Sequence, residues 1–161
     1  MRSIYKIVVC SLLTLSITSC EKDLLEKEQY QKEIYLIGAY NRVWTTEVSY
    51  SNEEVKTYFT VSSSGTLALD RDVNVKMKIN EELVDIYNKK YWTVLNEDKY
   101  YKSLDTDLYS IPSLENTVIK HAEGISTEVP VLIKTASLKI DQSYVIPVEI
   151  ESTTGYPVST S

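Results

Sequence analysis

The sequence has few of the residues that usually carry chemistry. Its 161 residues include two cysteines and a single histidine, His121. It contains no glycine-rich phosphate-binding loop, no dinucleotide-binding fingerprint and no Cys-x-x-Cys pair. His121 falls on an expected strand with no serine, cysteine or second histidine at a readable spacing, which favours a structural or surface role. The sequence therefore predicts a protein that is not an enzyme and that needs no cofactor.

Positive charge is also scarce. Lys and Arg number 17 against 23 Asp and Glu, which gives a formal net charge of −6. Residues 1–19 contribute Arg2 and Lys6 but no acid, so without them the balance is 15 basic against 23 acidic residues. An acidic surface repels phosphate backbones, and no basic stripe runs along the chain. Nucleic acid is therefore excluded as a partner.

Glycine, proline and phenylalanine are rare as well. There are four Gly, four Pro and one Phe, whereas 43% of the residues are hydrophobic and 13 are Tyr. This composition is typical of a folded chain and the length suits one domain. Tyrosine combines a large apolar ring with a hydroxyl that needs a partner, so it suits half-buried sheet faces and wet binding surfaces.

No apolar run is long enough to cross a membrane. The longest, residues 7–17, is about eleven residues against the roughly 20 that a spanning helix needs. It follows two basic residues, as the h-region of a secretory signal does. It ends in Ile17-Thr18-Ser19-Cys20, which resembles the bacterial lipobox. The resemblance implies cleavage before Cys20 and lipidation of Cys20; an ordinary signal peptide with a chance cysteine is the alternative.

Lipidation would give Cys20 a clear role. Once Cys10 is removed with residues 1–19, Cys20 is the only thiol and no intrachain disulfide can form. Several acyl chains on one residue hold a domain stably on a bilayer. Glu21, Lys22 and Asp23 resemble the surface-export signal of Bacteroidetes lipoproteins. We therefore expect a lipid anchor in the outer membrane with the domain facing the cell exterior, and keep a periplasm-facing domain as the alternative.

The rest of the chain alternates apolar and polar residues with the period of β-strands. The expected strands are 34–37, 55–61, 73–79, 117–121, 129–133 and 144–150. Pro130 and Pro147 cannot donate to a ladder, so their strands should be edge strands or carry bulges. One helix is expected at about residues 81–91, with Asn80 as its N-cap and an apolar row of Leu83, Ile86, Tyr87 and Tyr91. One helix among short strands indicates an all-β sandwich.

Four segments also resemble a known family. They are the strand and helix of residues 75–88, the segment 95–100, the turn 119–124 and the closing strand 144–150. Together they are similar to an N-terminal domain found on Bacteroidetes cell-surface lipoproteins. The resemblance implies an immunoglobulin-like β-sandwich, which in the family usually precedes a glycan-binding module or a family-18 endo-β-N-acetylglucosaminidase. Because residue 161 follows the closing strand closely, we expect this chain to be a stand-alone domain or a truncated form of such a protein. The activity of the second module should therefore not be assigned to it.

The expected organisation has four parts: a signal peptide at 1–19, a charged tether at 20–29, a β-sandwich domain at 30–155 and a tail at 156–161. Within the domain, the acid pairs Asp70 and Asp72, and Asp105 and Asp107, could offer oxygens to Ca²⁺. They lack the glycine and distal glutamate of an EF-hand loop, so solvated turn acids are favoured and no metal is expected.

Aromatic residues are the remaining candidates for a binding site. Tyr40, Trp44 and Tyr50 are surrounded by polar residues and could form a platform for sugar rings, with core packing as the alternative. A second cluster, Tyr91, Trp92, Tyr100 and Tyr101, is expected to pack in the core between the helix and a sheet.

These observations predict a non-catalytic, lipid-anchored surface domain that captures glycans or host macromolecules. Neighbouring genes for a SusC/SusD-type transporter pair would point to glycan uptake. The alternative function is a structural spacer or scaffold for a partner subunit or for a lost C-terminal module.

Overall fold

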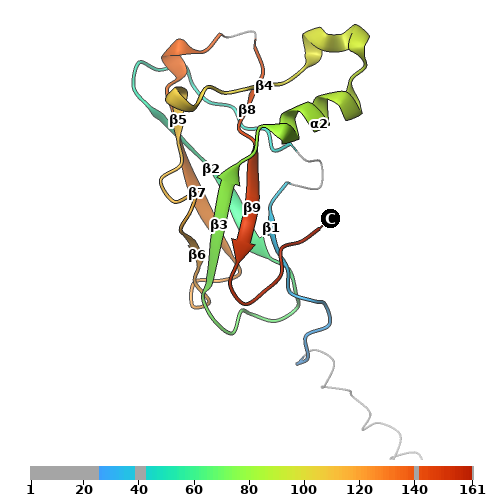
Figure 1. Cartoon of the computed structure of the whole chain (residues 1–161). Coiled ribbons are helices and arrows are strands. Elements are labelled where there is room, and N and C mark those ends of the chain that lie inside the picture. Colours follow the sequence, from blue (N-terminus) through green and yellow to red (C-terminus); the bar gives the residue numbers. More distant parts are fainter. Residues whose placement is uncertain (1–25, 39–42, 140–141, 161) are drawn as a thin grey trace, which may run out of the picture.

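Two antiparallel sheets face one another in the computed structural model, which describes residues 26–38, 43–139 and 142–160 (Figure 1). The first sheet has the order β1-β2-β7-β5, with β1 at Ile34–Leu36, β2 at Val55–Ser63, β7 at Ser126–Ile133 and β5 at Tyr109–Ser110. The second has the order β6-β3-β9, with β6 at Thr117–Ile119, β3 at Val73–Ile79 and β9 at Val148–Thr153. A short parallel pair joins β4 (Lys102–Ser103) to β8 (Tyr144–Val145). The remaining elements are α2 (Glu82–Tyr91) and the 3₁₀ turns η4 (Val94–Lys99), η5 (Thr106–Leu108) and η6 (Thr135–Ser137).

The core lies between the two sheets. On β3, Val73, Val75 and Met77 are buried while the residues between them are exposed, as the period of two predicts. They meet residues from β1, β2, β6 and β7. The buried members of this cluster are Ile34, Val61, Leu69, Val73, Val75, Met77, Ile119 and Val129. The prediction of an all-β sandwich with one short helix is confirmed.

The helix begins close to the predicted residue. The N-cap is Glu81, one residue later than predicted, but the Asn80 side chain still accepts a hydrogen bond from the N–H of Glu82 at 3.2 Å. The Asn80 carbonyl accepts a second bond, from the N–H of Leu83. Acidic residues lie in the first turn and Lys89 and Lys90 in the last, which complements the helix dipole.

The two prolines interrupt pairing in different ways. Pro130 of β7 lies opposite Tyr58 of β2 on one side of the strand. On the other side of β7, β5 pairs only with Leu132 and Ile133, so this edge of β7 is open at Pro130. At Pro147 the predicted strand 144–150 is broken into β8 and β9, which belong to different sheets. The prediction of one continuous strand is therefore wrong, because a residue without an N–H marks the point where the chain changes sheets.

Both ends of the described chain contact the sandwich. Within the segment expected to be the tail, Pro157 and Ser159 bond the backbone of Ile34, and Val158 forms a parallel bridge with it. Within the expected tether, the Glu28 carboxylate accepts hydrogen bonds from the N–H groups of Thr66 and Leu67. Residues on both sides of the predicted domain 30–155 thus contact the sandwich.

The Glu28 contact predicts an acid-dependent contribution to stability. A hydrogen bond from Lys32, helped by those from the 66–67 backbone, lowers the pKa of Glu28 from 4.5 to about 2. Because the pKa is lower in the folded chain, the contribution is complete above the unfolded-state value and is lost as pH falls from near 4.5 toward 2. We expect the denaturation midpoint of Glu28→Gln to lie below that of the wild type at pH 6, and the difference between the two midpoints to shrink below pH 4.5 and nearly vanish at pH 2. Glu26→Gln controls for the loss of one negative charge, and a gap that does not change with pH would contradict the prediction.

No helix in the described part of the chain combines the length and the apolar character needed to cross a membrane.

Candidate functional site

A groove of about 1070 Å³ opens at the α2 end of the sandwich. Its walls come from α2, from residues 43–50 and from residues 142–150, and the upper core residues of β2 and β7 form its floor. These segments are far apart in sequence, so the groove exists only in the folded chain. Of the predicted glycan-platform residues, Trp44 and Tyr50 both line it, while Tyr40 lies outside the described residues.

Trp44 is one of the exposed aromatic side chains that line the groove. It is 59% exposed, far from the buried state that core packing would require. Its indole lies against Gly38, whose φ of +88° suits glycine. A Cβ on Gly38 would lie 2.7 Å from Cε3 of Trp44, closer than carbon atoms can approach. One side of the indole is thus supported by backbone while much of the ring faces water.

This contact predicts that Gly38→Ala will displace Trp44. The positive φ should cost roughly 1–2 kcal/mol of folding free energy, and the added methyl group should also push the indole away. Gly124→Ala is the matched control, because Gly124 also has a positive φ (+131°) but nothing lies within 4 Å of an added Cβ. In a Trp92→Phe background, the fluorescence of Trp44 should change for Gly38→Ala and not for Gly124→Ala. An unchanged spectrum for both would contradict the packing described here.

Tyr50 lies on an extended segment anchored by one buried hydroxyl. It is 64% exposed. The N–H of Ser51 donates to Oγ1 of Thr135 at 2.9 Å, and the same hydroxyl lies 3.2 Å from the carbonyl oxygens of Ser49 and Ser51. Thr135 is buried, so these bonds are shielded from water. They hold the segment that carries Tyr50 against η6.

The helix turns a different face to the core from the one predicted. Val84 and Asn88 are its buried residues, whereas Leu83, Ile86 and Tyr91 are exposed. The reason lies in Asn88, whose amide donates to the Tyr101 carbonyl at 2.9 Å and accepts from the Tyr101 N–H at 3.0 Å. A buried amide with both bonds made is stable, so this residue faces inward.

The second aromatic cluster is only partly in the core. Tyr91 is 48% exposed, so its predicted burial is wrong, while Trp92 and Tyr101 are half-buried. Tyr87 lies between Tyr91 and Tyr101, with ring centroids 4.5 Å and 5.5 Å away. Tyr87, Tyr91 and Tyr101 all line the groove. Tyr91 and Tyr101 of the second cluster therefore share the groove with Trp44 and Tyr50 of the first, and no signal in the sequence would have joined them.

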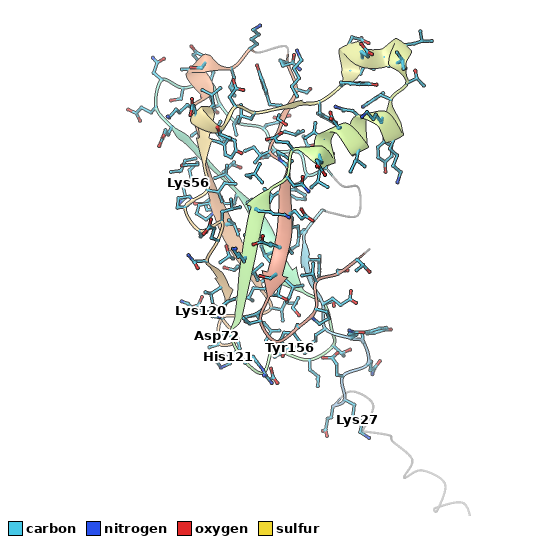
Figure 2. The ribbon with its side chains drawn as sticks, viewed as in Figure 1. Lys27, Lys56, Asp72, Lys120, His121 and Tyr156 are labelled. Atoms are coloured by element: carbon cyan, nitrogen blue, oxygen red, sulfur yellow. The ribbon has the colours of Figure 1, made fainter. Side chains whose placement is uncertain are left out.

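Asp72 and His121 lie at the pole of the sandwich opposite α2 (Figure 2). Asp70 binds Arg71 through two bonds of 2.9 Å and also accepts from the Tyr156 hydroxyl. Asp72 lies 2.6 Å from Nδ1 of His121, and the hydrogen bonds from His121 lower the pKa of Asp72. His121 itself follows the end of β6, not on it as predicted. Asp70 and Asp72 are thus paired within the protein, whereas Asp105 and Asp107 lie at η5, the first as its N-cap and the second within it.

No group of three or more His, Cys, Asp or Glu side chains is arranged to hold a metal ion among the described residues. Cys20, Glu21, Lys22 and Asp23, which carry the predicted lipidation and export signals, lie outside those residues.

Solved structures from Bacteroides ovatus share this fold. One, of unknown function, is 14% identical with a TM-score of 0.59 and is matched over 82% of this chain and 42% of its own. A multidomain protein including DUF1735 is 17% identical with a TM-score of 0.53, over 63% of this chain and 33% of its own. A "putative carbohydrate binding protein" is 19% identical with a TM-score of 0.60, over 80% of this chain and 34% of its own. None of these three is described as an enzyme, and this chain spans well under half the length of each.

A search of curated proteins finds no relative. A family described as an N-terminal domain matches residues 30–157, which is most of the chain. The protein therefore belongs to this family of N-terminal domains, which accords with its structural neighbours in Bacteroides.

Proposed function

We propose that this protein is a non-catalytic glycan-binding domain whose site is the groove at the α2 end. The exposed indole of Trp44, supported by Gly38 within an aromatic groove, is the observation that carries the proposal. The C–H groups on one face of a sugar ring pack well on a flat aromatic ring, while its hydroxyls remain in water or bond nearby polar groups. Tyr50 and Tyr91 offer two further exposed rings in the same groove.

The carbohydrate-binding description of one solved neighbour is in line with this proposal. At 19% identity that likeness shows the fold alone, so the argument depends on the groove of this chain.

We also propose that the domain is held on the outer membrane by lipid on Cys20 and faces the cell exterior. The geometry suits such an anchor, because Lys27 lies at the pole opposite α2 (Figure 2). A chain tethered through residues preceding Lys27 would present the groove away from the bilayer.

The direct test uses residues 21–161 on a glycan array, followed by calorimetry on any ligand found. Trp44→Ala should weaken binding about tenfold or more, since a central aromatic residue often dominates an interface. Tyr30→Ala is the control, because Tyr30 is exposed but does not line the groove. A wild-type domain that binds no glycan, or a Trp44→Ala variant that binds as tightly, would overturn the proposal.

A structural spacer is the second candidate function. It is favoured by one observation: in each of the three solved neighbours this fold is a minor part of a longer chain. A spacer would bind no glycan on the array and would co-purify with a stable partner, so the same experiment separates the two functions.

A further inference from the structure

We propose that the groove selects anionic oligosaccharides, through contacts of their carboxylate or sulfate groups with Lys90 and Lys139. The inference rests on the glycan-binding function proposed above and narrows its ligand class.

The balance of charge in the groove differs from that of the whole protein. The protein has a net charge of −6, yet only three charged residues line the described part of the groove: Lys90, Lys139 and Glu149. At physiological salt, charges more than about 8 Å from a ligand are largely screened. Distant acids therefore count for less than the charges of the lining, and two of the three described lining charges are positive.

Glu149, the one acid in the described lining of the groove, is already paired. The Glu149 carboxylate accepts a hydrogen bond from the Asn80 side chain at 2.8 Å and lies 3.4 Å from the Lys78 ammonium. Lys78 does not line the groove, so it offsets the charge of Glu149 from outside. Among the described lining residues, the charges left for an entering ligand to meet are those of Lys90 and Lys139.

Lys90 combines positive charge with an aromatic surface. Its ammonium lies 5.3 Å from the centroid of the Tyr91 ring, within the range of a cation–π contact. Tyr91 is itself exposed and lines the groove. A sugar that stacks on Tyr91 would hold a carboxylate or sulfate substituent within reach of the Lys90 ammonium. Lysine acts as a compact point charge, so this site does not discriminate between the two anions.

Lys139 lies on a different wall of the groove. It follows η6, whereas Lys90 is in the last turn of α2. A ligand that contacts both lysines must therefore reach two walls of the groove. This favours oligosaccharides with repeated acidic units over single charged sugars.

The test compares matched ligands that differ only in charge. One pair is a galacturonic acid hexamer and its methyl ester; the other is a sulfated galactan hexamer and its desulfated form. These are presented with other acidic and neutral pairs on an array, and the affinities are then measured by calorimetry. The protein variants are Lys90→Gln, Lys139→Gln and their combination. Lys89→Gln is the control, since Lys89 is the adjacent exposed lysine on α2 but does not line the groove.

The acidic member of at least one pair should bind about tenfold more tightly than its neutral partner. Each groove variant should lose roughly two- to fivefold in affinity for it, as is typical of exposed charge pairs. Lys89→Gln should bind like the wild type. Raising the salt concentration from about 0.05 to 0.5 M should lower the affinity of the wild type for the acidic ligand far more than that of the double variant. The pair that shows the effect distinguishes carboxylate from sulfate.

Equal binding of neutral and acidic partners, with unchanged affinity for the double variant, would overturn this inference and leave the glycan-binding function standing. Absence of binding to any sugar, neutral or acidic, would overturn both. Trp44→Ala further separates the glycan-binding function from the preference for anionic glycans, because it should weaken the binding of neutral and acidic ligands alike.

Discussion

Cys20→Ala should move the protein almost completely from the membrane fraction to the soluble fraction. The residue lies where the lipobox-like Ile17-Thr18-Ser19-Cys20 places the acylated cysteine. Each buried CH₂ contributes about 0.8 kcal/mol, so two or three acyl chains give an anchor that washing does not reverse. Alanine offers no thiol to acylate. The measurement is the share of the protein that pellets with membranes, together with the mass of the mature chain.

Cys10→Ala provides the matched control. Cys10 lies within the apolar run that would be cleaved off, so its loss should change neither the mature mass nor the membrane association. The fold of the Cys20→Ala protein should be unaltered, because the buried core clusters of the sandwich are built from residues 34–133. A Cys20→Ala protein that still pellets with membranes would contradict the lipid anchor.

Ile119→Ala should cost about 2–5 kcal/mol of the free energy of unfolding, since a large side chain is removed from a packed core. Ile119 is 0% exposed and lies opposite Val73, where β6 pairs with β3 in the second sheet. Domains of this size are stable by about 5–15 kcal/mol in total, so the loss would be a large fraction of the whole. Chemical denaturation with circular dichroism measures it directly.

Ile125→Ala is the control for this change. It removes the same atoms six residues later in the chain, but the side chain of Ile125 is 45% exposed. We expect Ile125→Ala to lower the free energy of unfolding by less than about 1 kcal/mol, because little apolar contact is lost at an exposed position. Similar losses for the two variants would mean that the sandwich core is not where the structure places it.

Local chemistry explains which predictions agreed with the structure. Val73, Val75 and Met77 predict β3 correctly, because a strand with one buried face needs an apolar residue at every second position. The start of α2 was also visible, since Asn80 satisfies a free N–H of the first turn through its own side chain. Each of these features depends on neighbours within a few residues.

The face that α2 buries was not predictable in the same way. Helical spacing favoured Leu83, Ile86 and Tyr91, and an asparagine would not be chosen for the core. Asn88 is buried because the backbone of Tyr101, 13 residues away, supplies both of its hydrogen bonds. A polar residue becomes a good core residue only when a distant partner is present, and no local pattern reports that partner.

The alternating strands, the helix after Asn80 and the lipobox-like signal at Cys20 follow from the sequence alone, because strand alternation, helix capping and a short apolar run are properties of consecutive residues. That Trp44, Tyr50 and Tyr91 line one groove with Lys90 and Lys139, and that Asp72 and His121 lie at the other pole, follows only from the folded structure. These relations join residues tens of positions apart, and the packing of the two sheets, which brings them together, is a property of the whole core.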